Sequence, residues 1–280
     1  MSIAFCHISP TPHLHDFALG RRWHLLLAHL IEEDEQYREF YTNLKTWQPG
    51  VKYIMDNSAF EMYKQGRPMY PTDKLLTMAR AVNADYIVMS DYPGQPWTKT
   101  RDVAVELGKE YKNQGFKSFY CPQSEIGDLD GLIESFKWAA DAENVDYVGF
   151  SILNIPNGYG VEKDNKLQRF LSRAHFVSTL RQRGILQEII RNFKKIHFLG
   201  MLDGPNEINF VPGGRTIINT WDSSAAVWAG LHGIQFDRTP TGLISGKFEK
   251  EVDFSFKCTD DRKIQLANGN VSYIDNLCNI

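Results

Sequence analysis

Five short runs of the sequence end in polar side chains that could do chemistry together. These residues are Asp56 in YIMDNSAFE, Asp91 in YIVMSDYPG, Gln123 in SFYCPQSE, Ser151 in YVGFSILN and Asp222 in TIINTWDSS. Carboxylates that share a site repel one another, which raises one pKa and separates an ionised nucleophile from a proton-shuttling acid or base. Each aspartate alone has an alternative, because an Asp after a strand often caps the next helix. Together the five positions favour a shared site.

A shared site requires elements that bring these residues to one place. Runs typical of buried parallel strands cover residues 3–8, 52–55, 86–90, 116–121, 147–151, 196–201, 216–221 and 233–236. Helical stretches alternate with them at 23–43, 72–82, 98–114, 129–142, 167–183 and 185–194. The alternation predicts an α/β fold, a single-domain TIM (β/α)8 barrel whose C-terminal strand ends open onto one face. An open doubly wound sheet is the alternative.

The last part of the chain has a different pattern. From Gly246 onward polar and apolar residues alternate around the pair Asn268-Gly269, and an Asn-Gly pair is a strong hairpin signal. The sequence therefore predicts a catalytic barrel over residues 1–245. Residues 246–280 are predicted to form a small β-hairpin appendage of the same domain.

The composition is that of an ordinary folded protein. It has 42% hydrophobic and 23% charged residues and a net charge of −3, which excludes the disordered and collagen-like classes. No segment approaches 18 uninterrupted apolar residues, so we expect a soluble, cytoplasmic protein with no membrane partner. The four cysteines form no CxxC pair. We therefore expect neither a disulfide framework nor a metal site, and no cofactor.

One segment is basic although the whole chain is slightly acidic. Residues 161–195 hold nine Lys or Arg against three acidic residues, a balance that could dock a phosphate backbone. A solvated helical face is the alternative. The nucleic-acid contacts that this segment predicts are Lys163, Lys166, Arg169, Arg173, Arg181 and Arg183.

The order and spacing of the strand ends resemble the tRNA-guanine transglycosylase superfamily. They are most similar to its short phage-type relatives, which insert 7-deazaguanine bases into DNA. The resemblance covers roughly residues 52–230 and rests on YIMDNSAFE, YIVMSD, CPQSE, YVGFSI, HFLGMLDGPNEI and NTWDSSAAVWAG. It implies exchange of guanine in a nucleic acid for a free 7-deazaguanine base such as preQ0. It also implies a cytoplasmic location, in the host cell if a phage encodes the chain.

The resemblance also implies roles for individual residues. Asp222 would attack the anomeric carbon, and Asp56 would handle protons on the departing and incoming bases. The substrate-binding residues would be Phe60, Asp91, Gln123, Gly149, Phe150 and Leu199. Among these, Phe60 would stack on the base opposite Leu199, and Gly149 with Phe150 would close the pocket through their backbone. Asp91 would bind the purine N–H edge, and Gln123 would read its carbonyl.

Three departures from the family pattern bear on the substrate. The usual DSGGF reads DNSAF here, so Ser58-Ala59 replaces Gly-Gly. No Cys/His zinc site follows Asp222, and the chain ends without a separate RNA-binding domain. The first departure bears on the geometry of the pocket, and the other two favour DNA over tRNA as the polymer. A protein partner could open a duplex so that the target base leaves the stack.

Three other functions remain open at this point. A barrel metal-dependent hydrolase could be built from the histidines, namely His13, His15, His175, His197 and His232, together with Asp237. Against it, the HLH at His13 lies several residues beyond its strand, and the position of His197 predicts the wrong end of the barrel. A retaining glycoside hydrolase would use Asp56 and Asp222 with water. A catalytically silent nucleic-acid-binding barrel subunit would need neither.

Overall fold

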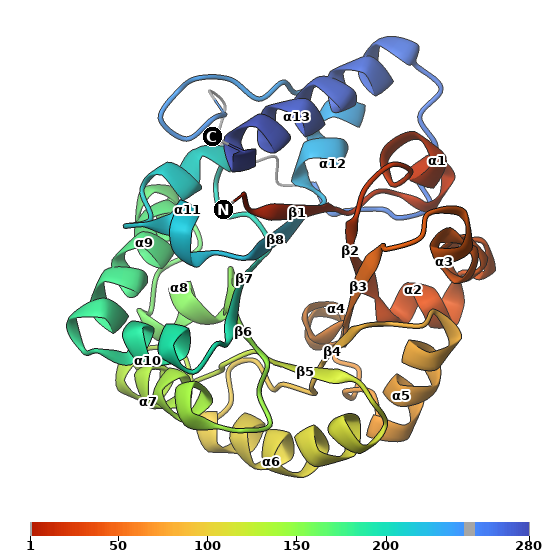
Figure 1. The fold of residues 1–280 in the computed structure, drawn as a ribbon. Coiled ribbons are helices and arrows are strands. Elements are labelled where there is room, and N and C mark those ends of the chain that lie inside the picture. The colour runs from red at the N-terminus through yellow and green to blue at the C-terminus, as the bar shows by residue number, and fades with distance from the viewer. Residues whose placement is uncertain (1, 244–249, 280) are drawn as a thin grey trace.

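The computed structural model of the chain describes residues 2–243 and 250–279, and it contains one eight-stranded parallel sheet. The strands are β1 (Ala4–His7), β2 (Trp23–Leu27), β3 (Lys52–Asp56), β4 (Tyr86–Val88), β5 (Lys117–Tyr120), β6 (Tyr147–Ser151), β7 (Lys195–Leu199) and β8 (Thr220–Ser223). They pair in the order β1-β8-β7-β6-β5-β4-β3-β2, and the end strands β1 and β2 lie side by side (Figure 1). The sheet is thus a nearly closed barrel, which confirms the predicted TIM fold.

Helices surround the barrel (Figure 1). Their bounds are η1 (Thr11–His13), α1 (Leu14–Phe17), α2 (Ala28–Glu33), α3 (Glu35–Trp47), α4 (Ala59–Gln65), α5 (Thr72–Ala81), α6 (Trp97–Asn113), α7 (Leu129–Asp141), α8 (Asn154–Gly158), α9 (Lys166–Gln182), α10 (Ile185–Arg191), η2 (Pro205–Asn209), α11 (Gly214–Ile217), α12 (Ala225–Leu231) and α13 (Asp261–Asn279). No helix in the two described ranges combines the length and apolar character needed to cross a membrane.

Two predicted segments differ in the structure. The sequence predicts a helix over residues 23–43, but its first five residues form β2 between β1 and β3. A short apolar run such as WHLLL does not distinguish a buried strand from a buried helix. The strand predicted at 233–236 is wrong, because these residues form a loop in which Gly233 has φ 84° and the Phe236 N–H donates to Asn270. The predicted number of strands is correct although one segment differs.

The predicted C-terminal β-hairpin is also wrong, because residues 261–279 form helix α13 and the Asn268-Gly269 pair lies inside it. A Cβ on Gly269 would meet open space, so the glycine marks no turn. The neighbouring Asn270 is buried, and its side chain bonds the backbone of Ala226 and Ile234. These tertiary bonds outweigh the local turn tendency of the pair.

Helix α13 belongs to the layer of helices around the barrel. It packs against α12 and lies beside β1 (Figure 1). The crossing with α12 is so close that a Cβ on Gly230 would lie 2.2 Å from the Cα of Ala267. The chain therefore needs glycine at this point. The predicted boundary between residues 245 and 246 lies outside the described residues.

The register of the sheet decides which strand ends face each other. Asp56 at the end of β3 pairs with Leu27 of β2, and Asp222 of β8 pairs with Cys6 of β1. Because β1 and β2 lie side by side, β3 and β8 stand on either side of this pair. The two aspartates therefore approach one end of the barrel from strands far apart in sequence.

Candidate active site

A pocket of about 690 Å³ opens at the C-terminal ends of the strands, where barrel enzymes place their active sites. It is lined by all five polar residues that end the predicted strands, namely Asp56, Asp91, Gln123, Ser151 and Asp222. The convergence expected from topology is therefore present. A structure with Asp56 and Asp222 at opposite ends of the barrel would have excluded a joint role.

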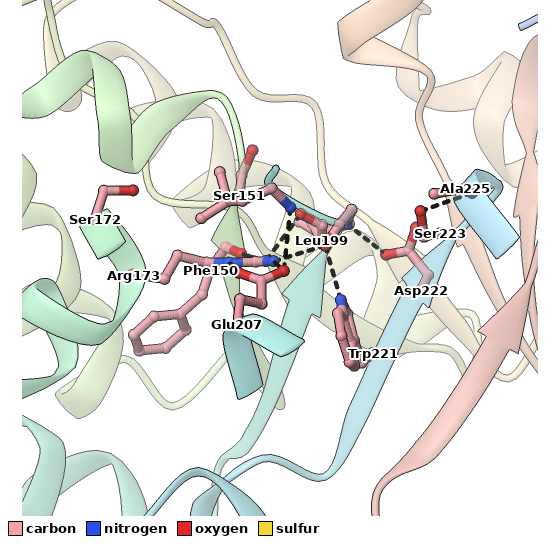
Figure 2. A network of polar contacts seen from close by, with 12 residues as sticks. Phe150, Ser151, Ser172, Arg173, Leu199, Glu207, Trp221, Asp222, Ser223 and Ala225 are labelled. Atoms are coloured by element: carbon pink, nitrogen blue, oxygen red, sulfur yellow. Dashed lines mark hydrogen bonds and ion pairs between the residues drawn. The ribbon is translucent and has the colours of Figure 1, made fainter. Parts of the chain in front are cut away.

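Asp222 is held by two N–H donors on one oxygen. Its Oδ1 lies 2.8 Å from Nε2 of His197 and 3.1 Å from the backbone nitrogen of Gly200 (Figure 2 shows the bond to the β7 end). The carboxylate is 5% exposed. The His197 ring inside the barrel and the backbone at the end of β7 therefore fix the orientation of Asp222 in the pocket.

His197 is a site residue that the sequence reasoning missed. It lies in the middle of β7 and is fully buried in the barrel, where Phe119 packs against its ring at 5.3 Å. The expectation that it lies at the wrong end of the barrel is wrong. The available signal was its spacing of two from Leu199, which puts both side chains on the inner face of the strand.

Asp56 sits among other acidic groups. Its Oδ2 accepts the Ser58 N–H at 2.8 Å. Burial raises the pKa of Asp56 well above its usual value, and the charges of Glu61 and Asp91 raise it further. A carboxyl in this environment holds its proton at a pH where an exposed one would have lost it.

Asp91 accepts hydrogen bonds from two side-chain amides. Nδ2 of Asn57 donates to its Oδ1 at 2.7 Å, and the amide of Gln123 donates to its Oδ2. Burial raises the pKa of Asp91 to about 6, although the two amide bonds oppose the shift. The predicted partners Asp91 and Gln123 therefore touch, and they form one continuous polar edge with Asn57.

The turn after β3 contains a residue with positive φ that is not glycine. Ser58 has φ 58°, in the left-handed region where glycine is preferred. Its Oγ lies 2.9 Å from Nδ1 of His29 and accepts the His29 N–H at 3.2 Å. These bonds offset the backbone cost of about 1–2 kcal/mol. The left-handed backbone at this position is therefore formed without glycine.

Glu61 is a further carboxylate of the pocket that was not predicted. It lies in α4 and lines the cavity. Burial raises its pKa. Its Oε2 is buried and accepts no hydrogen bond from the described residues. Its place at the end of YIMDNSAFE, five residues after Asp56, was the available signal.

The two residues predicted to stack on the base line the pocket. Gly149 and Phe150, predicted to close it through their backbone, are not among its lining residues. Phe60 and Leu199 both line the cavity, and Phe60 is 41% exposed at its mouth. Gly149 is buried one step lower, where a Cβ would lie 2.6 Å from Phe119 and 2.8 Å from Leu199. Phe150 packs outward, with its ring 5.5 Å from that of Phe198. The residue of β6 that lines the pocket is Ser151.

Arg173 is wrong as a nucleic-acid contact, because it is fully buried. Its Nε donates to Glu207 at 3.0 Å, and its guanidinium bonds the carbonyls of Phe150 at 3.0 Å, Leu199 at 3.2 Å and Gly200 at 2.8 Å (Figure 2). The ion pair therefore ties η2 to the ends of β6 and β7. The Gly200 peptide that it anchors also holds the nucleophile candidate.

The other basic residues predicted to bind nucleic acid are at the surface. Arg169 is half-buried, lines the pocket and lies 3.7 Å from Asp203. The exposed members are Lys163, Lys166, Arg181 and Arg183. Arg181 donates to the Pro212 carbonyl at 3.0 Å. Only Arg169 of this group therefore reaches the pocket itself.

The histidines do not assemble a metal site within residues 2–243 and 250–279, where no group of three or more His, Cys, Asp or Glu could hold an ion. Nδ1 of His13 lies 2.8 Å from Asp16, and its Nε2 accepts the Cys258 N–H at 2.9 Å. His15 packs edge-on against Phe40. The HLH pair therefore has a structural role beside the barrel.

The segment before α13 crosses the mouth of the pocket. Residues 250–255 line the cavity, and Glu251 pairs with Lys64 at 2.7 Å. The Lys250 carbonyl accepts the indole N–H of Trp228 at 3.1 Å, and the Phe254 carbonyl accepts the Thr11 N–H at 2.8 Å. The C-terminal part of the chain therefore supplies one wall of the site.

No family model matches the chain, and no curated protein matches it. Solved structures do match. A protein from Aquifex aeolicus VF5 is 9% identical, over 98% of this chain and 92% of that protein, with a TM-score of 0.53. Citrate synthase SbnG is 13% identical, over 82% of this chain and 90% of that enzyme, with a TM-score of 0.51.

A mandelate racemase/muconate lactonizing enzyme from Roseiflexus sp. is 9% identical over 79% of this chain, with a TM-score of 0.48. The match covers 54% of that enzyme, so this chain spans about half its length. At identities this low, similarity to the Aquifex protein and to SbnG shows the barrel fold alone.

Proposed function

We propose that the chain is a transglycosylase that exchanges guanine in a nucleic acid for a 7-deazaguanine base such as preQ0. One observation carries the proposal: two aspartates in different environments share one pocket. Asp222 is oriented by two N–H donors, whereas burial and the neighbouring carboxyl groups raise the pKa of Asp56 well above its usual value. A nucleophile and a proton donor with these properties are what a double displacement needs.

The first step forms a bond between Asp222 and C1′ of the target nucleotide. The C1′–N9 bond breaks, its electron pair leaves with guanine, and the Asp56 proton neutralises the departing base. In the second step the incoming base gives its N9 proton to the Asp56 carboxylate and attacks C1′, which releases Asp222. Protons balance because Asp56 recovers what it gave, and configuration at C1′ is retained.

The polar edge of the pocket suits a guanine-like base. The N1–H and exocyclic amine of guanine are donors, and the Asp91 carboxylate can accept from them. An adenine would leave this carboxylate partly unpaired, which costs about 1–3 kcal/mol. The amide of Gln123, already aligned on Asp91, would read the carbonyl edge, and Phe60 at the mouth would stack on the base.

A polymer can reach this pocket only with its target base turned out of the stack. Arg169 at the rim would contact a flanking phosphate, with Lys163 and Lys166 exposed beyond it. We propose DNA in preference to tRNA. A partner protein that opens a duplex would fit the same requirement, since a single-stranded substrate needs less energy to present its base.

Base exchange is tested directly with radiolabelled guanine and, separately, labelled preQ0. The purified protein is incubated with each base and with DNA or tRNA, and label in the polymer is counted. We expect incorporation by the wild type and loss of at least about 10³-fold in Asp222→Ala. The exposed Asp102→Ala on α6 serves as the matched control and should keep wild-type incorporation, with folding of both variants checked by circular dichroism.

The other outcomes identify the remaining functions. Release of guanine from the polymer without incorporation of label would indicate a retaining hydrolase, in which water replaces the incoming base. Binding of polymer with neither release nor incorporation would indicate a silent nucleic-acid-binding subunit. Either result contradicts the transglycosylase proposal.

A further inference from the structure

The two oxygens of Asp222 have different surroundings. Oδ1 accepts from Nε2 of His197 and from the Gly200 N–H. Oδ2 accepts no hydrogen bond from residues 2–243 or 250–279, and the carboxylate lines the pocket. One oxygen is therefore anchored in the barrel, and the other is left for a reactant.

Each ring nitrogen of His197 contacts one hydrogen-bonding group. A carboxylate can only accept, so the 2.8 Å contact with Asp222 requires a hydrogen on Nε2. In the neutral ring Nδ1 is then an acceptor, and the Thr220 hydroxyl at 2.6 Å donates to it. Thr220 and His197 thus form a two-step chain that ends on Oδ1 of Asp222.

We propose that His197 is a positioning residue that anchors Oδ1 of Asp222, makes Oδ2 the attacking oxygen, and speeds breakdown of the covalent intermediate. This inference rests on the proposed function. In the first step Oδ2 bonds to C1′ and the carboxylate becomes a neutral ester whose carbonyl oxygen is Oδ1. In the second step the C1′–Oδ2 bond breaks, and its electron pair returns to Asp222.

The direction of the effect follows from charge. A hydrogen bond to a carboxylate is stronger than one to an ester carbonyl, so the Nε2–H stabilises free Asp222 more than the intermediate. It therefore favours release of Asp222 as a leaving group in the second step. Without this donor the enzyme should accumulate as the glycosyl ester, while the base pocket around Asp91 and Phe60 stays unchanged.

The test measures this accumulation in the full chain. Wild type and His197→Leu turn over a guanine-containing single-stranded DNA oligonucleotide with preQ0, reactions are acid-quenched, and intact mass gives the fraction of enzyme carrying oligonucleotide. For His197→Leu we expect an adduct fraction several-fold higher, kcat lower by about 10- to 100-fold, and KM for the base within about twofold of wild type.

A conservative variant separates positioning from packing. The side chain of Gln can place an N–H donor near the position of Nε2, so His197→Gln should bring adduct and kcat back toward wild type. Thr220→Val, which removes the hydroxyl next to Nδ1, should shift both in the direction of His197→Leu and serves if the Leu variant does not fold. Wild-type kcat in His197→Leu, or reduced kcat with less adduct, overturns the inference.

A second measurement does not depend on turnover. Long-range ¹H–¹⁵N NMR of the histidine rings, with His197→Gln to assign the signal, should show His197 as the neutral Nε2–H tautomer. The Nδ1–H tautomer would overturn the inference even if exchange occurs. If the wild type forms no adduct and incorporates no base with DNA or tRNA, the proposed function fails, and the tautomer still decides the claim about His197.

Discussion

Asp56 and Asp222 are the same residue type at equivalent places in the barrel, but their surroundings differ. Asp56 ends β3 next to Glu61 and Asp91, and burial with these charges raises its pKa well above the usual value. Asp222 on β8 meets N–H groups from β7 and the peptide after it. Environment thus separates two like residues, because burial and nearby charge raise the pKa of Asp56 whereas two N–H donors orient Asp222.

Substitution of Asp56 tests its proposed role as proton donor and acceptor most directly. Asp56→Asn keeps the shape of the side chain but removes the transferable proton, so exchange should fall by about 10²- to 10⁴-fold. Binding of the free base should change little, because Asp91, Gln123 and Phe60 remain. Steady-state label incorporation and base binding by calorimetry check the two expectations. Wild-type exchange in this variant would remove Asp56 from the mechanism.

Substitution of Glu61 tests whether neighbouring charge contributes to the raised pKa of Asp56. Glu61→Gln removes one of the charges that raise the pKa of Asp56, so that pKa should fall. The first step needs protonated Asp56, and the alkaline limb of the kcat profile should therefore move to lower pH. Glu125→Gln, at an exposed position outside the pocket, is the control. An unchanged profile in Glu61→Gln contradicts this account.

A further expected effect is on stability, through Asp91. Its folded pKa of about 6 lies above the usual value, so the folded state binds more protons between the two. The resulting stabilisation is present below pH 4 and is lost as pH rises through 6, by about 3 kcal/mol. Asp91→Asn cannot titrate. Urea unfolding from pH 4 to 7 should show a smaller decline than wild type, and parallel curves would contradict the shift.

Much of the fold was predictable because parallel strands and covering helices have different periodicities. The eight-stranded barrel was found although β2 was read as the start of a helix and residues 233–236 as a strand. Both errors have the same physical origin. The periodicity of a short apolar run does not distinguish a buried strand from a buried helix, and only tertiary packing decides between them. The hairpin error at Asn268-Gly269 arose because buried bonds of Asn270 override a local turn preference.

The site was predictable where a residue ends a strand. Asp56, Asp91 and Asp222 could be grouped because parallel strands finish at one face of a barrel. The inward direction of His197 follows from its spacing of two from Leu199, but its contact with Thr220 depends on the register of β7 against β8, which the sequence does not reveal. Arg173 was wrongly predicted to contact nucleic acid. The number of Lys and Arg residues in a segment does not reveal that one arginine is buried in an ion pair with Glu207.

In the proposed mechanism Asp222, rather than Asp56, forms the bond to the nucleic acid. The most direct measurement is acid quenching during turnover of guanine-containing DNA, followed by protease digestion and mass mapping of the modified peptide. We expect a deoxyribosyl-linked adduct on the peptide that contains Asp222, and we expect it to be absent in Asp222→Ala. An adduct on Asp56, or base exchange that persists in Asp222→Ala, would contradict it.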